Sequence, residues 1–118
     1  MKKSFLIVAA VLAVLLVGCS QAKKSFDTSL IPGKWVTGTE YWVFETGGVG
    51  HTWNTADDVE EEEATQLTWS VTNDCLTITL IGEMGQQVPK VYTISELSKT
   101  TFRYGDAYGK VYNLTRVE

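Results

Sequence analysis

The side chains able to do chemistry in this 118-residue chain are few. His51 is the single histidine, and Cys75 directly follows a predicted turn. A zinc or iron site needs several nitrogen or sulfur ligands at close spacing, and none flank His51 in the sequence. We therefore expect no metal or other cofactor, a polar strand position for His51 and an inert thiol at Cys75. No nucleophile motif such as Gly-x-Ser-x-Gly is present, and we do not expect an enzyme.

An acidic run over residues 57–63 is the most conspicuous polar feature. Carboxylates bind calcium, but the run lacks the alternating acids and central glycine of a calcium loop. An acidic docking patch for a protein partner is one interpretation. We favour a solvated loop, or a short helix that begins at Thr55 with Asp58 as its capping partner.

Aromatic side chains form the other chemically informative group. Flat rings give a ligand a large contact area, and the polar tips of Trp and Tyr orient it. A small barrel also fills its interior with such rings, so we expect core packing for most of them. Tyr41 is out of phase with Trp42 and Tyr108 lies in a turn, so both are expected to be exposed. The candidate ligand-binding residues are Tyr41, Trp42, Phe44, Trp53, Trp69, Tyr104 and Tyr108.

A second cysteine ends the N-terminal segment. Lys2 and Lys3 precede an apolar run over residues 5–17, which leads through Gly18 into Cys19. Thirteen residues rising about 1.5 Å each cover roughly 20 Å, less than the hydrocarbon core of about 30 Å. The pattern therefore favours an export signal over a membrane-spanning anchor.

Leu16-Val17-Gly18-Cys19 resembles the lipobox of bacterial lipoproteins in residue type, order and distance from Met1. An ordinary secretory signal with a coincidental cysteine is the alternative. The resemblance implies cleavage before Cys19, a diacylglycerol thioether on its sulfur and membrane attachment through the acyl chains. Ser20 stands where inner-membrane lipoproteins of the enteric type carry Asp. The resemblance thus implies a cell-envelope protein, lipid-anchored in the outer membrane and facing the periplasm.

This interpretation divides the chain into a signal peptide (1–18), a flexible tether carrying Cys19 (19–29) and one domain (30–118). Two of the ten basic side chains lie in the signal, against 14 acidic ones elsewhere, so the mature chain has a net charge of −6. Phosphate binding needs clustered Lys and Arg, so nucleic acid is not an expected partner. With Cys19 assigned to lipid, we expect no disulfide, and we expect a monomer.

From residue 33 onward, apolar residues alternate with polar ones between turn signals rich in Gly, Asn, Asp and Ser. This pattern predicts short antiparallel strands with one apolar face each. The sharpest hairpin is expected at Asn73-Asp74, because both residues tolerate the positive φ of a two-residue turn. Eight strands are expected, near residues 34–38, 40–46, 49–54, 66–72, 75–81, 87–95, 100–105 and 109–116.

Closing such a sheet on itself buries the apolar faces and removes both edges. We therefore predict an all-β fold, a small antiparallel up-and-down barrel of about eight strands. A two-sheet sandwich would give a similar pattern, because strand pairing is not visible in the sequence. A barrel of this size has room for its own side chains or for one small ligand.

Gly33-Lys34-Trp35 resembles the Gly-x-Trp start of lipocalin-like barrels. Trp42-Val43-Phe44, the segment 67–71 and the last strand ending at Arg116 are similar to the lipocalin-like domains of bacterial lipoproteins. The resemblance implies that Trp35, after Gly33, closes the barrel floor and that Arg116 packs across it. The short loops depart from the family and argue against a large lipophilic ligand.

Two functions are compatible with these observations. The first is a membrane-anchored lipoprotein whose barrel binds a small apolar or amphipathic ligand at its open end. The second is a periplasmic interaction or inhibitor module. It would dock on a protein partner through its loops or the acidic run, with the barrel filled by its own side chains. The resemblance favours the first, although a fold alone does not fix a function.

Overall fold

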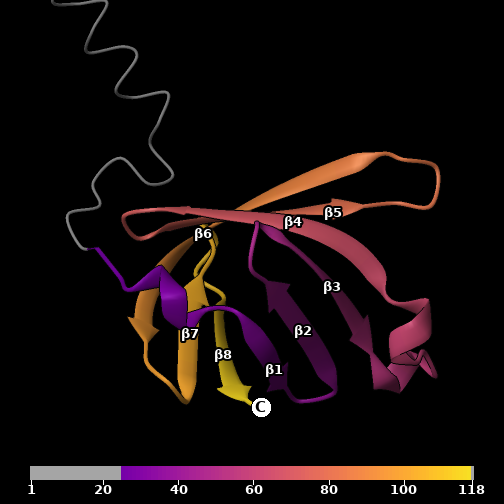
Figure 1. The fold of residues 1–118 in the computed structure, drawn as a ribbon, viewed down its shortest axis with the longest axis horizontal. Coiled ribbons are helices and arrows are strands. Elements are labelled where there is room, and N and C mark those ends of the chain that lie inside the picture. Colours follow the sequence, from indigo (N-terminus) through magenta and orange to yellow (C-terminus); the bar gives the residue numbers. More distant parts are fainter. Residues whose placement is uncertain (1–24, 118) are drawn as a thin grey trace, which may run out of the picture.

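The computed structural model describes residues 25–117, so the predicted signal peptide, the lipobox and Cys19 lie outside the described part of the chain. Eight strands form one closed antiparallel barrel in which each strand pairs with the next and β8 pairs with β1 (Figure 1). This confirms the predicted barrel and excludes the sandwich. The strands are β1 (Gly33–Thr37), β2 (Glu40–Glu45), β3 (Val49–Asn54), β4 (Thr65–Thr72), β5 (Cys75–Ile81), β6 (Gln87–Leu97), β7 (Thr101–Gly105) and β8 (Val111–Arg116).

The strand ends follow the turn residues. Asn73 adopts a φ of 57° in the β4–β5 hairpin, as expected for this turn, whereas Asp74 does not have the positive φ that the prediction allowed for both residues. β6 continues past residue 95 to Leu97, through an irregularity in its register with β7. β8 begins at Val111 rather than at 109, because Gly109 has a φ of 87° and the Asp106 carboxylate accepts hydrogen bonds from two backbone N–H groups of the turn.

One end of the barrel is closed by the segment that leads into β1. A 3-10 turn, η1 (Thr28–Leu30), is capped by the Asp27 side chain and places Ile31 in the core. The Trp35 indole N–H donates to the carbonyl of Ile31 at 2.9 Å. Phe26 packs against the same core, so ordered structure begins before residue 30.

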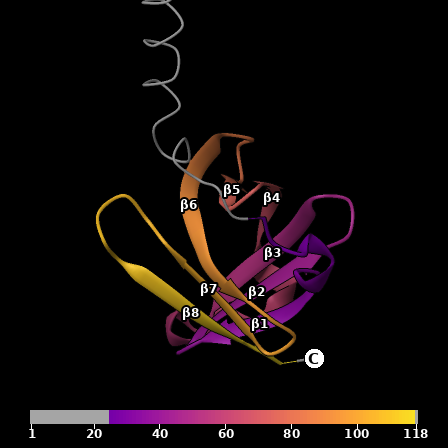
Figure 2. The ribbon, with the colours of Figure 1, turned by 90° about the vertical axis from the view of Figure 1, so that its left-hand side faces the viewer.

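The connections at the opposite end are residues 38–39, 55–64, 82–86 and 106–110. We call this the open end. The β5–β6 hairpin and the β3–β4 loop project at the same end in Figure 1, and the β7–β8 connection projects from the barrel in Figure 2. The β3–β4 loop contains two more 3-10 turns, η2 (Thr55–Asp57) and η3 (Glu61–Glu63).

Burial alternates along the strands as the barrel requires. The inward positions of β2, Trp42 and Phe44, are buried, while Tyr41 and Val43 face the other way. Rings fill the interior toward the closed end, where Phe102 contacts the edges of Trp35 and Phe44 with centroids 5.5 and 5.9 Å apart. Within residues 25–117 no helix has the length and apolar character needed to cross a membrane.

Candidate ligand-binding site

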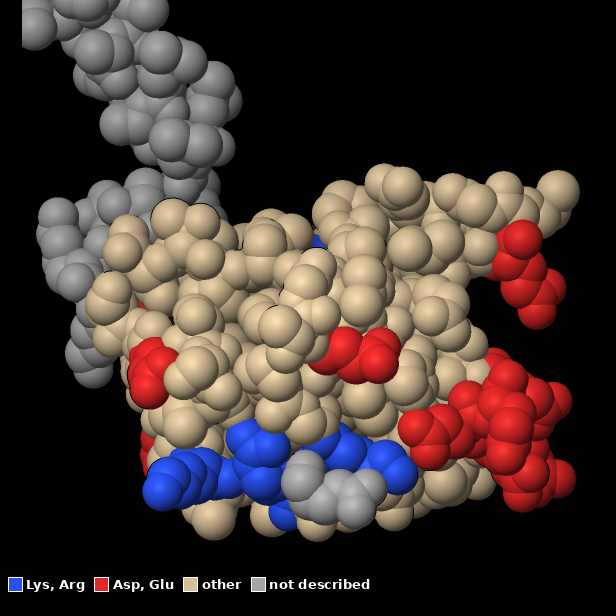
Figure 3. Space-filling view, in the orientation of Figure 1, with Lys and Arg blue, Asp and Glu red and all other residues tan. Residues whose placement is uncertain are grey.

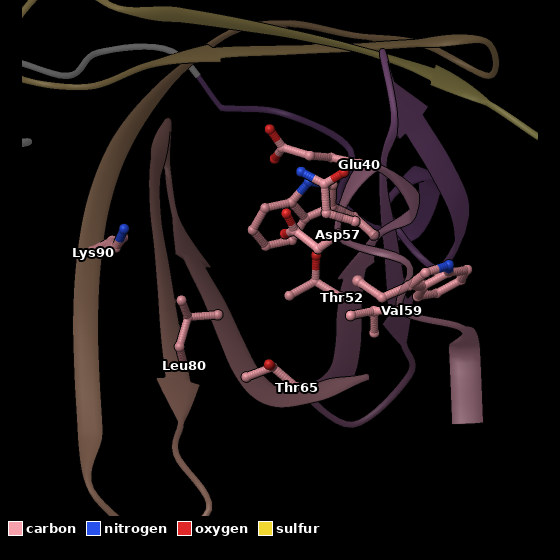
Figure 4. Close-up of a pocket in the computed structure, with 10 residues that line it drawn as sticks. Glu40, Thr52, Asp57, Val59, Thr65, Leu80 and Lys90 are labelled. Carbon is pink, nitrogen blue, oxygen red and sulfur yellow. The ribbon is translucent and has the colours of Figure 1, made fainter. Parts of the chain in front are cut away.

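A cavity of about 330 Å³ lies at the open end of the barrel. This volume is at the lower end of the range for small-molecule sites, about 300–1,000 Å³. Side chains from β2, β3, β4, β5, β6 and the β3–β4 loop form its walls (Figure 4). The lining residues are Glu40, Trp42, Thr52, Trp53, Asn54, Asp57, Val59, Thr65, Leu80 and Lys90.

Trp42 contributes the one buried side-chain donor of the cavity wall that has no acceptor among the described residues. Its side chain is 8 % exposed, and its Nε1 atom is buried. The indole of Trp35, by contrast, satisfies its N–H within the protein. A buried donor without a partner costs about 1–3 kcal/mol, and an acceptor that reached this N–H would remove that cost.

The carboxylates of Glu40 and Asp57 lie on one wall of the cavity. Glu40 begins β2, and Asp57 ends η2. The backbone N–H of Thr55 donates to the carbonyl of Thr39 at 2.9 Å, which fastens η2 beside the residue that precedes Glu40. The Asn54 side chain accepts from the Thr39 hydroxyl at 2.7 Å and from the N–H of Ala56 at 2.9 Å. These bonds hold the two acids on neighbouring pieces of backbone.

The opposite wall comes from β5 and β6. Figure 4 shows Lys90 and Leu80 facing Glu40, Asp57 and Thr52 across the cavity. The Thr52 hydroxyl donates to the carbonyl of Tyr41 at 2.7 Å, so this donor is already used within the protein. The cavity therefore has a cation and an apolar side chain on one wall and two anions on the other.

A second hollow of about 330 Å³ adjoins the first at Lys90. Tyr92, Tyr108 and Tyr112 contribute to its lining, together with Asp106. Tyr92 and Tyr104 contact each other with centroids 4.7 Å apart. Burial, followed by the charges of Tyr112, Asp106 and Glu40, raises the pKa of Tyr92 to about 12. Burial raises the pKa of Tyr104 well above its ordinary value as well, so both phenols are neutral at physiological pH.

The β3–β4 loop is fastened to the outer wall of the barrel through Glu61. Its carboxylate lies 2.9 Å from His51 Nε2 and 3.4 Å from Lys34 Nζ. The hydrogen bond from His51 is the main cause that lowers the pKa of Glu61 below its ordinary value. Because the same loop carries Asp57 and Val59, this contact helps hold one wall of the cavity in place.

The acidic run is exposed, and Figure 3 shows acidic side chains gathered where this loop lies. Thr55 begins η2, but the capping residue is Asn54, whose side chain accepts the N–H of Ala56. Asp58 is not the predicted capping partner, because it adopts a left-handed φ of 61° at the end of the turn. Among residues 25–117 no group of three or more His, Cys, Asp or Glu side chains has the arrangement of a metal site.

The structure places the predicted ligand-binding residues in different surroundings. Trp42 and Trp53 line the first cavity, and Tyr108 lines the second and is 95 % exposed. Tyr41 is half-buried on the outer wall, because it stacks on Trp53 with centroids 5.1 Å apart. The remaining three, Phe44, Trp69 and Tyr104, line neither cavity.

Phe44, Trp69 and Tyr104 serve the interior packing. Phe44 and Trp69 meet edge to face with centroids 5.8 Å apart, and Tyr104 stacks on Tyr112 at 5.4 Å. Trp69 also donates its indole N–H to the carbonyl of Val49 at 3.0 Å. These rings therefore belong to the packing of the barrel interior and not to the cavity walls.

The prediction of an inert thiol at Cys75 is wrong, because Cys75 is disulfide-bonded. The sequence has one other cysteine, Cys19, which lies outside the described residues. The expectation rested on the lipobox resemblance, which assigned Cys19 to lipid.

The charged residues that line the cavity, Glu40, Asp57 and Lys90, were not among the predicted site residues. Glu40 shares the inward phase of β2 with Trp42, and Lys90 shares the phase of the buried Tyr92 on β6. A charged residue in the inward phase of a strand was the available signal. Asp57 had no comparable signal, because a loop residue has no strand phase.

The fold and the site define a class of protein: a closed antiparallel barrel with a small, partly polar cavity at one end. A family model described as a lipocalin-like domain matches residues 21–104. The chain therefore belongs to the lipocalin-like domain family. The match ends at Tyr104, within β7, whereas the barrel in the structure also includes β8, which ends at Arg116. No curated protein and no solved structure matches the chain.

Proposed function

We propose that this protein is a lipid-anchored lipoprotein of the cell envelope whose barrel binds a small amphipathic molecule at its open end. The observation that carries the binding function is the buried indole N–H of Trp42, which faces no acceptor of the described chain and belongs to the wall of a cavity. The lipocalin-like family supports the same function, because its barrel is a small-ligand-binding fold. The cavity volume of about 330 Å³ favours a compact ligand over a large lipid.

Native mass spectrometry of the protein purified from its own host tests the binding function. We expect a reproducible additional mass of a few hundred daltons at most, lost when the protein is denatured. A bare protein mass under several gentle conditions would contradict ligand carriage.

The anchor is supported by the lipobox resemblance at Leu16-Val17-Gly18-Cys19. Replacing Cys19 with Ala should move the protein from the membrane to the soluble fraction; continued membrane binding would contradict the anchor. The disulfide at Cys75 allows a second test of the anchor, by mass. A thioether to lipid and a disulfide to Cys75 would use the same Cys19 sulfur, so one molecule cannot carry both. Intact mass under non-reducing conditions distinguishes a diacylglycerol adduct from a chain that has lost its thiol hydrogens.

A second function, docking on a protein partner, is favoured by two apolar side chains at the open end. Met84 at the tip of the β5–β6 hairpin is 92 % exposed, and Tyr108 projects from the β7–β8 connection. Co-purification from the host, compared between the parent and a Met84→Ser, Tyr108→Ser variant, tests this function. Loss of a stoichiometric partner in the variant would support docking, and an unchanged set of proteins would contradict it.

A further inference from the structure

We propose that the open-end cavity selects a small zwitterion, a molecule with an ammonium group at one end and a carboxylate or another strong acceptor at the other. This inference rests on the proposed ligand-binding function and specifies its chemistry. It arises from four polar residues of the cavity wall, two that donate and two that accept, whose side chains have no hydrogen-bond or ion-pair partner among residues 25–117.

The acceptor side consists of Glu40 and Asp57. Among the described residues neither carboxylate has an ion pair or a side-chain hydrogen bond, although both lie on one cavity wall (Figure 4). The hydrogen bonds from the Thr55 N–H to the Thr39 carbonyl and from the Thr39 hydroxyl to Asn54 hold them there before any ligand arrives. Two prepositioned carboxylates next to an indole ring suit an ammonium group, which gains ion pairing and a cation–π contact.

The donor side consists of Trp42 and Lys90. The Trp42 N–H is buried without an acceptor in the described chain. The Lys90 ammonium group stands across the cavity from the two acids and has no ion pair with a described residue. An ammonium group cannot accept a hydrogen bond, so a ligand that carried only a cation would leave the buried Trp42 N–H without a partner and Lys90, which is exposed, to water. A carboxylate on the same ligand supplies the acceptor.

Shape restricts the ligand further. Leu80, on the wall of Lys90, and Val59, on the loop that carries Asp57, contribute apolar surface to the cavity, which suits a short hydrocarbon spacer. A chain with two charged ends also matches a cavity whose positive and negative walls face each other. A fatty acid, in contrast, would bring its carboxylate into a cavity that already contains two acids.

The test is calorimetric titration of the protein purified as the full chain from its host with four six-carbon probes. The probes are ε-aminocaproate, hexanoate, hexylamine and hexanol, which differ only in their end groups. We expect ε-aminocaproate to bind about ten-fold or more tightly than each of the others, the effect of one charge-assisted hydrogen bond. Hexanol or hexanoate binding as tightly as ε-aminocaproate would overturn the zwitterion while leaving ligand binding in place.

Isosteric variants of the lining residues test whether the probes bind in the cavity and not elsewhere on the surface. Glu40→Gln and Asp57→Asn should each weaken ε-aminocaproate binding about ten-fold and leave hexanol binding unchanged. Trp42→Phe should weaken every probe that has an acceptor. The matched control is Glu45→Gln, an exposed acid at the other end of the same strand, which should change nothing.

Unchanged ε-aminocaproate affinity in both acid variants, with their circular dichroism spectra unchanged, would overturn the assignment of the ammonium site. If none of the four probes binds, the zwitterion inference fails. The native mass spectrum of the host protein then decides independently whether ligand binding fails with it.

Discussion

The guanidinium carbon of Arg116 lies 4.4 Å from the centroid of the Trp35 ring, and the two residues are paired across the β1–β8 seam that closes the barrel. Arg116 also donates to the carbonyls of Lys99 at 2.6 Å and Pro32 at 3.1 Å, and to that of Leu30. One side chain thus joins the first strand, the segment before it and the β6–β7 connection. This junction closes the end of the barrel that lies away from the cavity.

Replacing Arg116 with Ala should destabilise the fold by about 2–4 kcal/mol, because it removes several charge-assisted hydrogen bonds and a cation–π contact. Arg116→Lys should recover only part of this loss, since an ammonium group cannot reproduce the planar fork of a guanidinium. Urea unfolding followed by circular dichroism measures both effects. The comparison is Arg103→Ala, which removes a surface pair with Glu96 and should cost about 1 kcal/mol or less. Equal losses at the two arginines would contradict the role of Arg116.

Substituting Phe for each of two buried tryptophans, Trp35 and Trp42, should lower the stability of the fold by different amounts. Trp35→Phe leaves the carbonyl of Ile31 without its donor, whereas Trp42→Phe removes an N–H that has no acceptor in the described chain. Without ligand, we expect Trp35→Phe to cost about 1–3 kcal/mol more than Trp42→Phe. Denaturant midpoints of the two variants test this difference, and the opposite order would show that the Trp42 N–H is satisfied in solution.

Acid should loosen the β3–β4 loop before the barrel unfolds. The pKa of Glu61 is lower in the folded state than in the unfolded state, mainly through the His51 hydrogen bond and secondarily through Lys34. Its contribution is therefore complete above the unfolded pKa and disappears as the pH falls through the folded pKa. Limited proteolysis of residues 57–63 should accelerate on going from neutral pH to about pH 3. Glu61→Gln should already show fast cleavage at neutral pH, while Glu62→Gln should behave like the parent.

Alkali should destabilise the open end. The pKa of Tyr92 is raised to about 12 and that of Tyr104 is also raised, so the unfolded chain loses these protons first. Stability is then complete below the ordinary tyrosine pKa of about 10 and falls as the pH rises toward the folded values. Ultraviolet titration of phenolate should show a late phase that becomes smaller in Tyr92→Phe. Titration of all five tyrosines near their ordinary pKa would contradict the burial.

The sequence predicted the barrel well because turn residues and alternation act locally. Asn73 and Gly109 end strands for conformational reasons that are visible in the sequence. Trp53 pairs with Tyr41 in the register of β2 with β3 and so shares the outer face with it. This was not predictable, because Gly50 occupies an inward position of β3 and supplies no side chain to mark the phase. The positions of Glu40, Asp57 and Lys90 around one cavity depend on strand register and loop conformation, which the sequence pattern does not specify.

The indole N–H signal of Trp42 gives the most direct test of a ligand site at the open end of the barrel. In a nitrogen–proton correlation spectrum, the tryptophan indole signals can be assigned by single Trp→Phe substitutions. Addition of the six-carbon probes should shift the Trp42 signal, most strongly with ε-aminocaproate, and leave the Trp35 signal in place. A Trp42 signal that no probe moves, or equal shifts at Trp35 and Trp42, would contradict a ligand site at the open end.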